Sequence, residues 1–68
     1  MKANRRNLKL AMARACLTPE QLAEKADMPR PTLNNVLVGR NVRPSTLGRV
    51  ARALGVEVEA IWDEFEEE

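Results

Sequence analysis

The side chains of this 68-residue chain best suited to binding a polar partner are those of arginine, lysine and asparagine, which donate hydrogen bonds to anions and to other acceptor groups. Catalytic candidates are few, because the chain has no His and no Tyr, and Cys16 has neither a second cysteine nor a histidine to activate it. The same counts exclude a Cys/His zinc site and an intrachain disulfide. We therefore expect no enzyme, no cofactor and no metal, and we expect Cys16 to be a small buried apolar residue.

Charge is divided unevenly along the chain. Residues 1–52 hold all 11 Lys and Arg against three acids, a net charge of +8, whereas residues 53–68 hold seven acids and no base. A basic body suits a polyanionic partner, and an acidic tail at about residues 63–68 would be held away from one. The alternative is an ordinary solvated surface. Because no run of 18 apolar residues and no signal-peptide core occurs, we expect a soluble, cytoplasmic protein with no membrane partner.

Helices must position these side chains, because apolar residues recur at spacings of three and four and no stretch alternates for long. We predict an all-α fold in a single domain, residues 1–68. The first helix follows Asn4 and ends near Cys16, and the second fills residues 19–26. The third runs to about Val38, and the fourth opens at Ser45 or Thr46 and closes at Gly55. A fifth, amphipathic helix carries Val56, Val58, Ile61, Trp62 and Phe65.

Local signals mark several of these boundaries. Thr18 is a helix N-cap, Pro19 occupies the first helical position and Gln21 completes a capping box. Gly39 is the expected left-handed cap after the third helix. Pro29 and Pro31 do not break that helix, because a proline in the first turn removes only N–H groups that have no intrahelical partner. Since a residue before proline disfavours the α region, we expect Arg30 to be extended and Pro31 to be the first helical residue.

The second and third helices would meet at a steep angle across a short turn, with Leu22, Ala26, Met28, Leu33 and Val36 pointing into the junction. This helix-turn-helix pattern, "LTPEQLAEKADMPRPTLNNVLVGR", and the following "VRPSTLGRVARALGV" resemble the phage lambda-repressor and Cro-like (Xre-type) family over roughly residues 5–63. The resemblance implies a compact five-helix DNA-binding domain. It also implies a sequence-specific, double-stranded DNA-binding transcriptional regulator, a small repressor of bacterial, phage or mobile-element origin, whose third helix enters the major groove.

The resemblance also assigns residues to roles on DNA. With Leu33, Val36 and Leu37 facing inward, the outward residues available for base readout are Arg30, Pro31, Asn34 and Asn35. Arginine suits guanine O6 and N7, and asparagine suits adenine N6 and N7. The expected phosphate contacts are Thr18, Thr32, Arg40, Asn41 and Arg43. The alternative for Asn34 and Asn35 is that they are merely polar surface residues, and Lys9, Arg14 and Arg49 are weaker candidates because such residues are usually just solvated.

Three departures from the family pattern carry information. Asp27 stands where the family usually has glycine in the turn, and it can be left-handed at a cost of roughly 1 kcal/mol. Pro19 replaces a glutamine that usually contacts phosphate, so one backbone anchor is lost. Met12 and Leu37 stand where many relatives have a partly buried arginine–glutamate pair. Exchanging both charges for apolar groups is coherent, so we expect Met12 and Leu37 to touch in the core.

Two further expectations concern partners. The alternative function is an antitoxin-like protein-interaction module that uses Trp62 and Phe65, although core packing also explains these aromatics. One recognition helix reads too few base pairs to select a site from a genome, so two copies should pair on an inverted-repeat operator. Because the acids of residues 57–68 would repel their copies, we expect a monomer or a weak homodimer without DNA.

Overall fold

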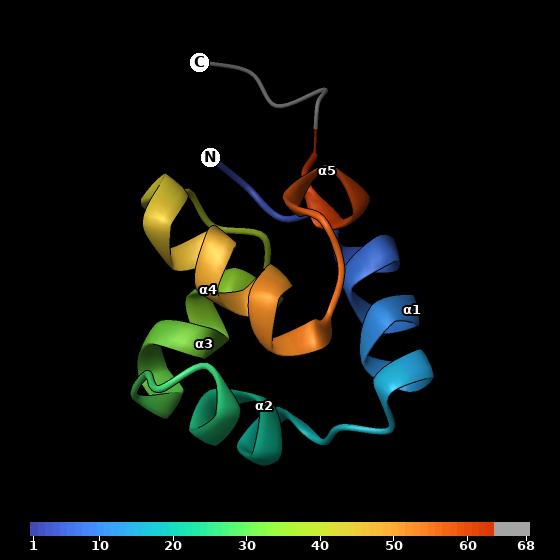
Figure 1. Cartoon of the computed structure of the whole chain (residues 1–68). Helices are drawn as coiled ribbons and strands as arrows, with labels where there is room; N and C mark the ends of the chain where they lie inside the picture. Colours follow the sequence, from blue (N-terminus) through green and yellow to red (C-terminus); the bar gives the residue numbers. More distant parts are fainter. Residues whose placement is uncertain (64–68) are drawn as a thin grey trace.

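In the computed structural model, which describes residues 1–63, five helices follow one another along the chain (Figure 1). They are α1 (Arg5–Ala15), α2 (Pro19–Lys25), α3 (Arg30–Leu37), α4 (Pro44–Leu54) and α5 (Val58–Ile61). Within the described residues the only β-type pairing is one isolated bridge between Ala3 and Trp62. The all-α prediction is confirmed. No helix in this part of the chain has the length and apolar character needed to cross a bilayer.

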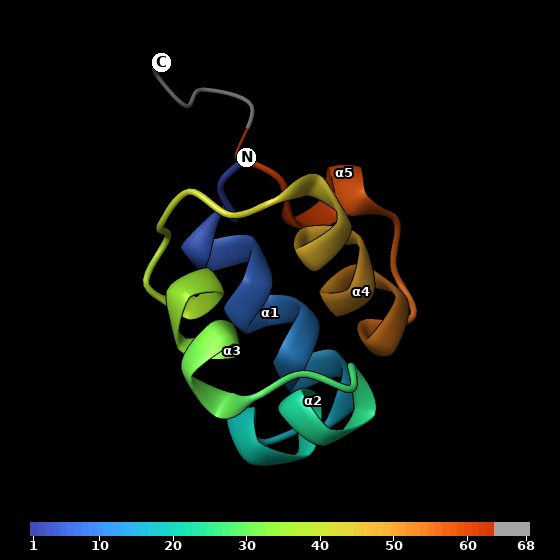
Figure 2. The same ribbon diagram turned by 90° about the vertical axis from the view of Figure 1, so that its left-hand side faces the viewer.

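The five helices pack around one another (Figure 2), and each contributes buried side chains to one apolar core. The largest fully buried side chains are Leu8, Leu22, Leu33, Val36, Leu47, Val50 and Ile61. No polar or charged residue is buried within residues 1–63. Leu22 and Ala26, predicted to point into the junction of α2 and α3, are buried, and on α3 Leu33 and Val36 are fully buried while Leu37 is partly buried.

Helices α1 to α4 all end in the same way. A left-handed residue follows each helix, and two backbone hydrogen bonds close the last turn in a Schellman arrangement. After α3 the Gly39 amide donates to the Val36 carbonyl (3.1 Å) and the Arg40 amide to the Asn35 carbonyl (2.9 Å). The left-handed residues are Cys16 (φ 56°), Asp27 (φ 55°), Gly39 (φ 80°) and Gly55 (φ 72°). The predicted left-handed cap at Gly39 and the predicted end of the fourth helix at Gly55 are therefore confirmed, and Asp27 adopts the left-handed conformation that its residue type allows.

The prediction that Cys16 is buried is wrong. Cys16 is exposed, because it occupies the left-handed position after α1, where the chain turns over the surface towards α2. Its sulfur therefore adds nothing to the core.

The starts of α1 and α2 match the prediction, and α3 and α4 begin one or two residues earlier than predicted. Asn4 caps α1 through the Asn7 amide (3.0 Å), and the capping box of Thr18 and Gln21 is present as predicted. Helix α3 begins at Arg30 rather than Pro31, because the Pro29 carbonyl already accepts the first helical hydrogen bond, from the Leu33 amide (3.2 Å). Helix α4 begins at Pro44 rather than at Ser45 or Thr46, since a proline fits the first helical position.

The fifth helix is shorter than predicted. It is a single turn, and Trp62 leaves it in an extended conformation to pair with Ala3. The Asn4 amide donates to the Ile61 carbonyl (2.7 Å), and the Asp63 amide to the Lys2 carbonyl (2.9 Å). These bonds, to partners 57 and 61 residues away in sequence, replace the helical bonds that would have continued α5. Phe65 lies outside the described residues.

The N-terminal segment also reaches the loop between α3 and α4. The Val42 amide donates to the Met1 carbonyl (2.8 Å). Residues 1–4 therefore join this loop to the residues that follow α5, so the position of the loop depends on contacts from both ends of the described chain.

Candidate nucleic-acid interface

The turn at Asp27 brings the start of α3 beside the start of α2. Arg30, the first residue of α3, lies with a guanidinium nitrogen 3.5 Å from a carboxylate oxygen of Glu20. Because the Arg30 and Glu20 side chains are 42% and 85% exposed, this ion pair adds little to stability. Its consequence is geometric, since it joins α2 to the outer face of α3.

Arg30 also contacts Asn34, one helical turn later. Its Nε donates to the Asn34 Oδ1 (3.1 Å) on the outer face of α3. Pro31, the next residue, is exposed at the start of the same helix. Three of the four residues predicted for base readout thus lie at exposed positions in the first five residues of α3, and two of them are bonded to each other.

The fourth, Asn35, is half-exposed and is bonded to Arg40 from the following loop. An Arg40 guanidinium nitrogen donates to the Asn35 Oδ1 (3.3 Å), while the Arg40 amide donates to the Asn35 carbonyl (2.9 Å). The turn that closes α3 therefore places the Arg40 side chain against the last turns of that helix. Arg40, predicted as a phosphate contact, lies against a residue predicted for base readout.

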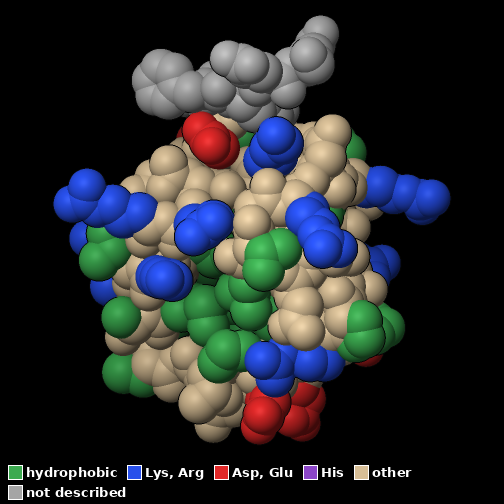
Figure 3. Space-filling view, turned by 180° about the vertical axis from the view of Figure 1, so that it is seen from behind, with side chains coloured by type: hydrophobic (Ala, Val, Ile, Leu, Met, Phe, Trp, Pro, Cys, Tyr) green, Lys and Arg blue, Asp and Glu red, His purple; other side chains and the backbone are tan. Residues whose placement is uncertain are grey.

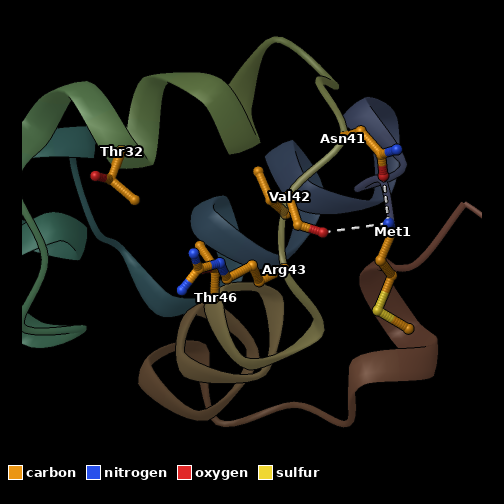
Figure 4. A pocket seen from close by; sticks show the side chains of 6 residues that line it. All are labelled: Met1, Thr32, Asn41, Val42, Arg43 and Thr46. Atoms are coloured by element: carbon orange, nitrogen blue, oxygen red, sulfur yellow. Dashed lines mark hydrogen bonds between the residues drawn. The ribbon is translucent and has the colours of Figure 1, made fainter.

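Next to this pair, the loop after α3 and the first turn of α4 surround an open hollow of about 580 Å³ (Figure 4). Thr32 faces it from α3, and Arg43 and Thr46 face it from the start of α4. Asn41 lies at its edge, where its Oδ1 accepts a hydrogen bond from the Met1 amino group. Three of the five predicted phosphate contacts are thus gathered around one space lined with hydroxyl and guanidinium groups.

Thr18 lies at the other end of the surface. Its hydroxyl oxygen accepts a hydrogen bond from the Gln21 amide (3.2 Å) at the start of α2, and the residue is exposed. Glu20 on the same turn contacts Arg30, the first residue of α3, so this turn lies beside the start of that helix. We use the name α3 surface for the outer residues of α3 together with Thr18 and the loop after α3. It comprises Thr18, Arg30, Pro31, Thr32, Asn34, Asn35, Arg40, Asn41 and Arg43.

Charge on this side of the molecule is mainly positive. Helix α3 lies away from the viewer of Figure 1, as Figure 2 shows, and Figure 3 presents that far side. Lys and Arg side chains are spread over this face around a central group of hydrophobic side chains, and acidic side chains lie at its margins (Figure 3). Such a field attracts a polyanion. Among residues 1–63 no group of three or more His, Cys, Asp or Glu side chains could hold a metal ion.

Sequence reasoning missed Glu20, Thr46 and the Met1 amino group, all of which contact or line the α3 surface. The Arg30–Asn34 bond could have been found, because residues at i and i+4 face each other on a helix. The Arg30–Glu20 pair and the hollow depend on tertiary contacts, for which the sequence gives no local signal.

Comparison with known proteins agrees with this geometry. A helix-turn-helix family model, HTH_3, matches residues 5–61. A solved structure of a hydroxyethylphosphonate dioxygenase variant is similar, with a TM-score of 0.82 and 24% identity over 98% of this chain. The similar region makes up 15% of the dioxygenase chain, and the similarity shows the fold alone. No curated protein sequence matches. The residues matched by the family model include every helix described above, and the chain belongs to the lambda-repressor and Cro-like (Xre-type) helix-turn-helix family of DNA-binding regulators.

Proposed function

We propose that the protein is a cytoplasmic, sequence-specific transcriptional regulator of bacterial, phage or mobile-element origin, a small repressor that places α3 in the major groove of its operator. The observation that carries the proposal is the α3 surface: one exposed helix face of Arg and Asn side chains, flanked at both ends by groups suited to phosphate. An α-helix fits the width of the major groove, and these side chains match its base edges.

Each part of the α3 surface has a role in this proposal. Arg30, Pro31, Asn34 and Asn35 contact base edges, and the Pro31 ring offers an apolar contact for a thymine methyl group. Thr18 on one flank, and the group around the hollow on the other, bind phosphates and fix the register of the helix on the duplex. The phosphate-binding group around the hollow comprises Thr32, Asn41 and Arg43, with Arg40 beside it.

The protein would pair on DNA, because one recognition helix contacts too few base pairs to select a site in a genome. Two copies would bind half-sites of an inverted repeat about one helical turn, roughly 34 Å, apart. Because the acids of residues 57–68 repel their copies, the free protein would be a monomer or a weak dimer at low micromolar concentration. Sedimentation would show a light species without DNA and two chains per duplex with it. A tight dimer without DNA, or one chain per duplex on the best site, would contradict this assembly.

The proposed function is tested by titrating salt in a duplex-binding assay. The logarithm of the binding constant should fall linearly with the logarithm of the salt concentration, by about 0.9 for each phosphate neutralised. Arg43→Ala should lower this slope by about one contact and weaken binding to all sequences alike. The matched control is Arg14→Ala, which removes the same charge from a site beside α5, away from the hollow.

The two variants separate a positioned contact from general attraction. We expect Arg14→Ala to leave the slope unchanged. Equal effects of the two substitutions would mean that charge alone attracts DNA, and binding that does not depend on salt would contradict the proposed function.

A further inference from the structure

We propose that the two Arg–Asn pairs of the α3 surface make this protein read guanine rather than adenine, and that Arg40 is the residue that positions Asn35 for this choice. The inference deepens the proposed function and rests on it. It also departs from the simple expectation that asparagines on a recognition helix select adenine.

The first step is the orientation of the two amides. A guanidinium has donors only, so the amide atom that faces it must be the oxygen, Oδ1. The Asn34 Oδ1 accepts from Arg30 (3.1 Å), and the Asn35 Oδ1 accepts from Arg40 (3.3 Å). In each pair the free donors are the amide NH₂ and the remaining guanidinium N–H groups, and the second lone pair of Oδ1, next to a cation, is the one acceptor left. Both pairs therefore present mainly donors.

The second step is the match to a base edge. Guanine presents two acceptors in the major groove, N7 and O6, whereas adenine presents the N7 acceptor beside an N6 amino donor. To bind adenine with two bonds, an asparagine must turn its oxygen towards the N6 amino group. Here that oxygen is bonded to a cation, and the positive charge of the cation also repels the amino hydrogens. The acceptor pair of guanine fits the same surface without rearrangement.

The third step is the support that holds the pairs in place. Arg40 is fixed by its own amide on the Asn35 carbonyl (2.9 Å) and by the left-handed Gly39 before it. The backbone at Gly39 packs closely on Arg5, since a Cβ there would lie 3.1 Å from the Arg5 Cδ. On the other pair, the Glu20 carboxylate holds the Arg30 guanidinium from the α2 side (3.5 Å). Arg40 is thus held to Asn35 by both its backbone and its side chain, and Arg30 has a second anchor, Glu20, besides Asn34.

The experiment is selection of bound sequences from a random duplex library, followed by affinity measurements on duplexes with guanine or adenine at one position. The position read by Asn35 is the one at which Asn35→Ala loses its discrimination. We expect the parent protein to prefer guanine there. Arg40→Ala releases the Asn35 oxygen, so the ratio of guanine to adenine affinity should fall by about tenfold or more. Arg40→Lys, which keeps a charged donor, should restore the preference for guanine.

The matched control is Arg43→Ala, an exposed arginine of the same loop that lines the hollow. It should lower the affinity for both duplexes equally and leave their ratio unchanged. A parent protein that selects adenine at the Asn35 position would overturn the inference while leaving the proposed function intact, and so would an unchanged ratio in Arg40→Ala. If no sequence is enriched at all, the proposed function fails and the inference fails with it.

Discussion

Helix α3 has two faces that depend on different physical effects. On the inner face, Leu33 and Val36 are fully buried, in a core that contains no polar or charged residue within residues 1–63. On the outer face, Arg30 and Asn34 are exposed, and their hydrogen bonds compete with water. Burial of apolar area is the dominant favourable term in folding, whereas an exposed polar pair contributes little.

This difference separates stability from recognition on a single eight-residue helix. Substitutions on the inner face should unfold the protein before they alter its choice of DNA. Substitutions on the outer face should alter DNA binding in a protein that remains folded.

The largest effect is expected at Met12, a core residue of α1 with 9% exposure. Met12→Arg should destabilise the protein by about 3–5 kcal/mol, because it buries a charge without a partner. Adding Leu37→Glu should recover part of this loss if the two side chains touch, as predicted. Denaturant unfolding of both single variants and the double variant measures the coupling. A Met12→Arg protein that unfolds at the denaturant concentration of the parent would disprove the packing.

Asn35, on the outer face, should show the opposite behaviour. Asn35→Ala is expected to cost about 1–3 kcal/mol on the preferred duplex and to leave the free energy of unfolding almost unchanged. Random duplex DNA should bind as it does to the parent protein. Equal loss of affinity on specific and random duplexes would remove Asn35 from the readout set.

Gly39 lies between the two faces, at the turn that ends α3. Gly39→Ala should destabilise the protein by about 1–2 kcal/mol, because alanine is strained at φ 80° and its Cβ would lie 3.1 Å from the Arg5 Cδ. Gly48 in α4 is the matched control, since a Cβ there meets nothing within 4 Å. Gly48→Ala should stabilise the protein by about 0.5–1 kcal/mol. Thermal melts that moved in the same direction for both variants would contradict this account of the turn.

The smallest effect concerns Asp27, which adopts the same left-handed conformation with a side chain present (φ 55°). Asp27→Gly should stabilise the protein by less than about 1 kcal/mol, because relief of the left-handed strain exceeds the greater flexibility of glycine in the unfolded chain. A thermal melt that shows destabilisation would mean that the Asp27 side chain supports the turn.

Local signals in the sequence predicted the parts of the fold that depend on neighbouring residues. The capping box of Thr18, the left-handed cap at Gly39 and the helix end at Gly55 form from residues within a few positions of one another. The length of α5 could not be predicted in this way, because Trp62 leaves the helix to pair with Ala3 from the other end of the chain. Cys16 was misjudged for a related reason, since composition indicates burial but says nothing of a backbone turn.

In the candidate site, too, local contacts could be predicted from the sequence and tertiary contacts could not. Periodicity correctly assigned Arg30 and Asn34 to the outer face of α3, and their spacing of four allows the bond between them. The Arg40–Asn35 bond spans the end of the helix and requires the left-handed turn at Gly39, which periodicity does not describe. The ion pair with Glu20 needs the angle between α2 and α3, which only the packed core determines.

The most direct test of the central claim, that the outer face of α3 reads the major groove, is binding to a selected duplex whose purines carry CH in place of N7. The substitution removes a major-groove acceptor from guanine and adenine and leaves the minor groove unchanged. We predict that affinity for the altered duplex falls by about tenfold or more, towards that for random DNA. Unchanged affinity for the altered duplex would contradict the account.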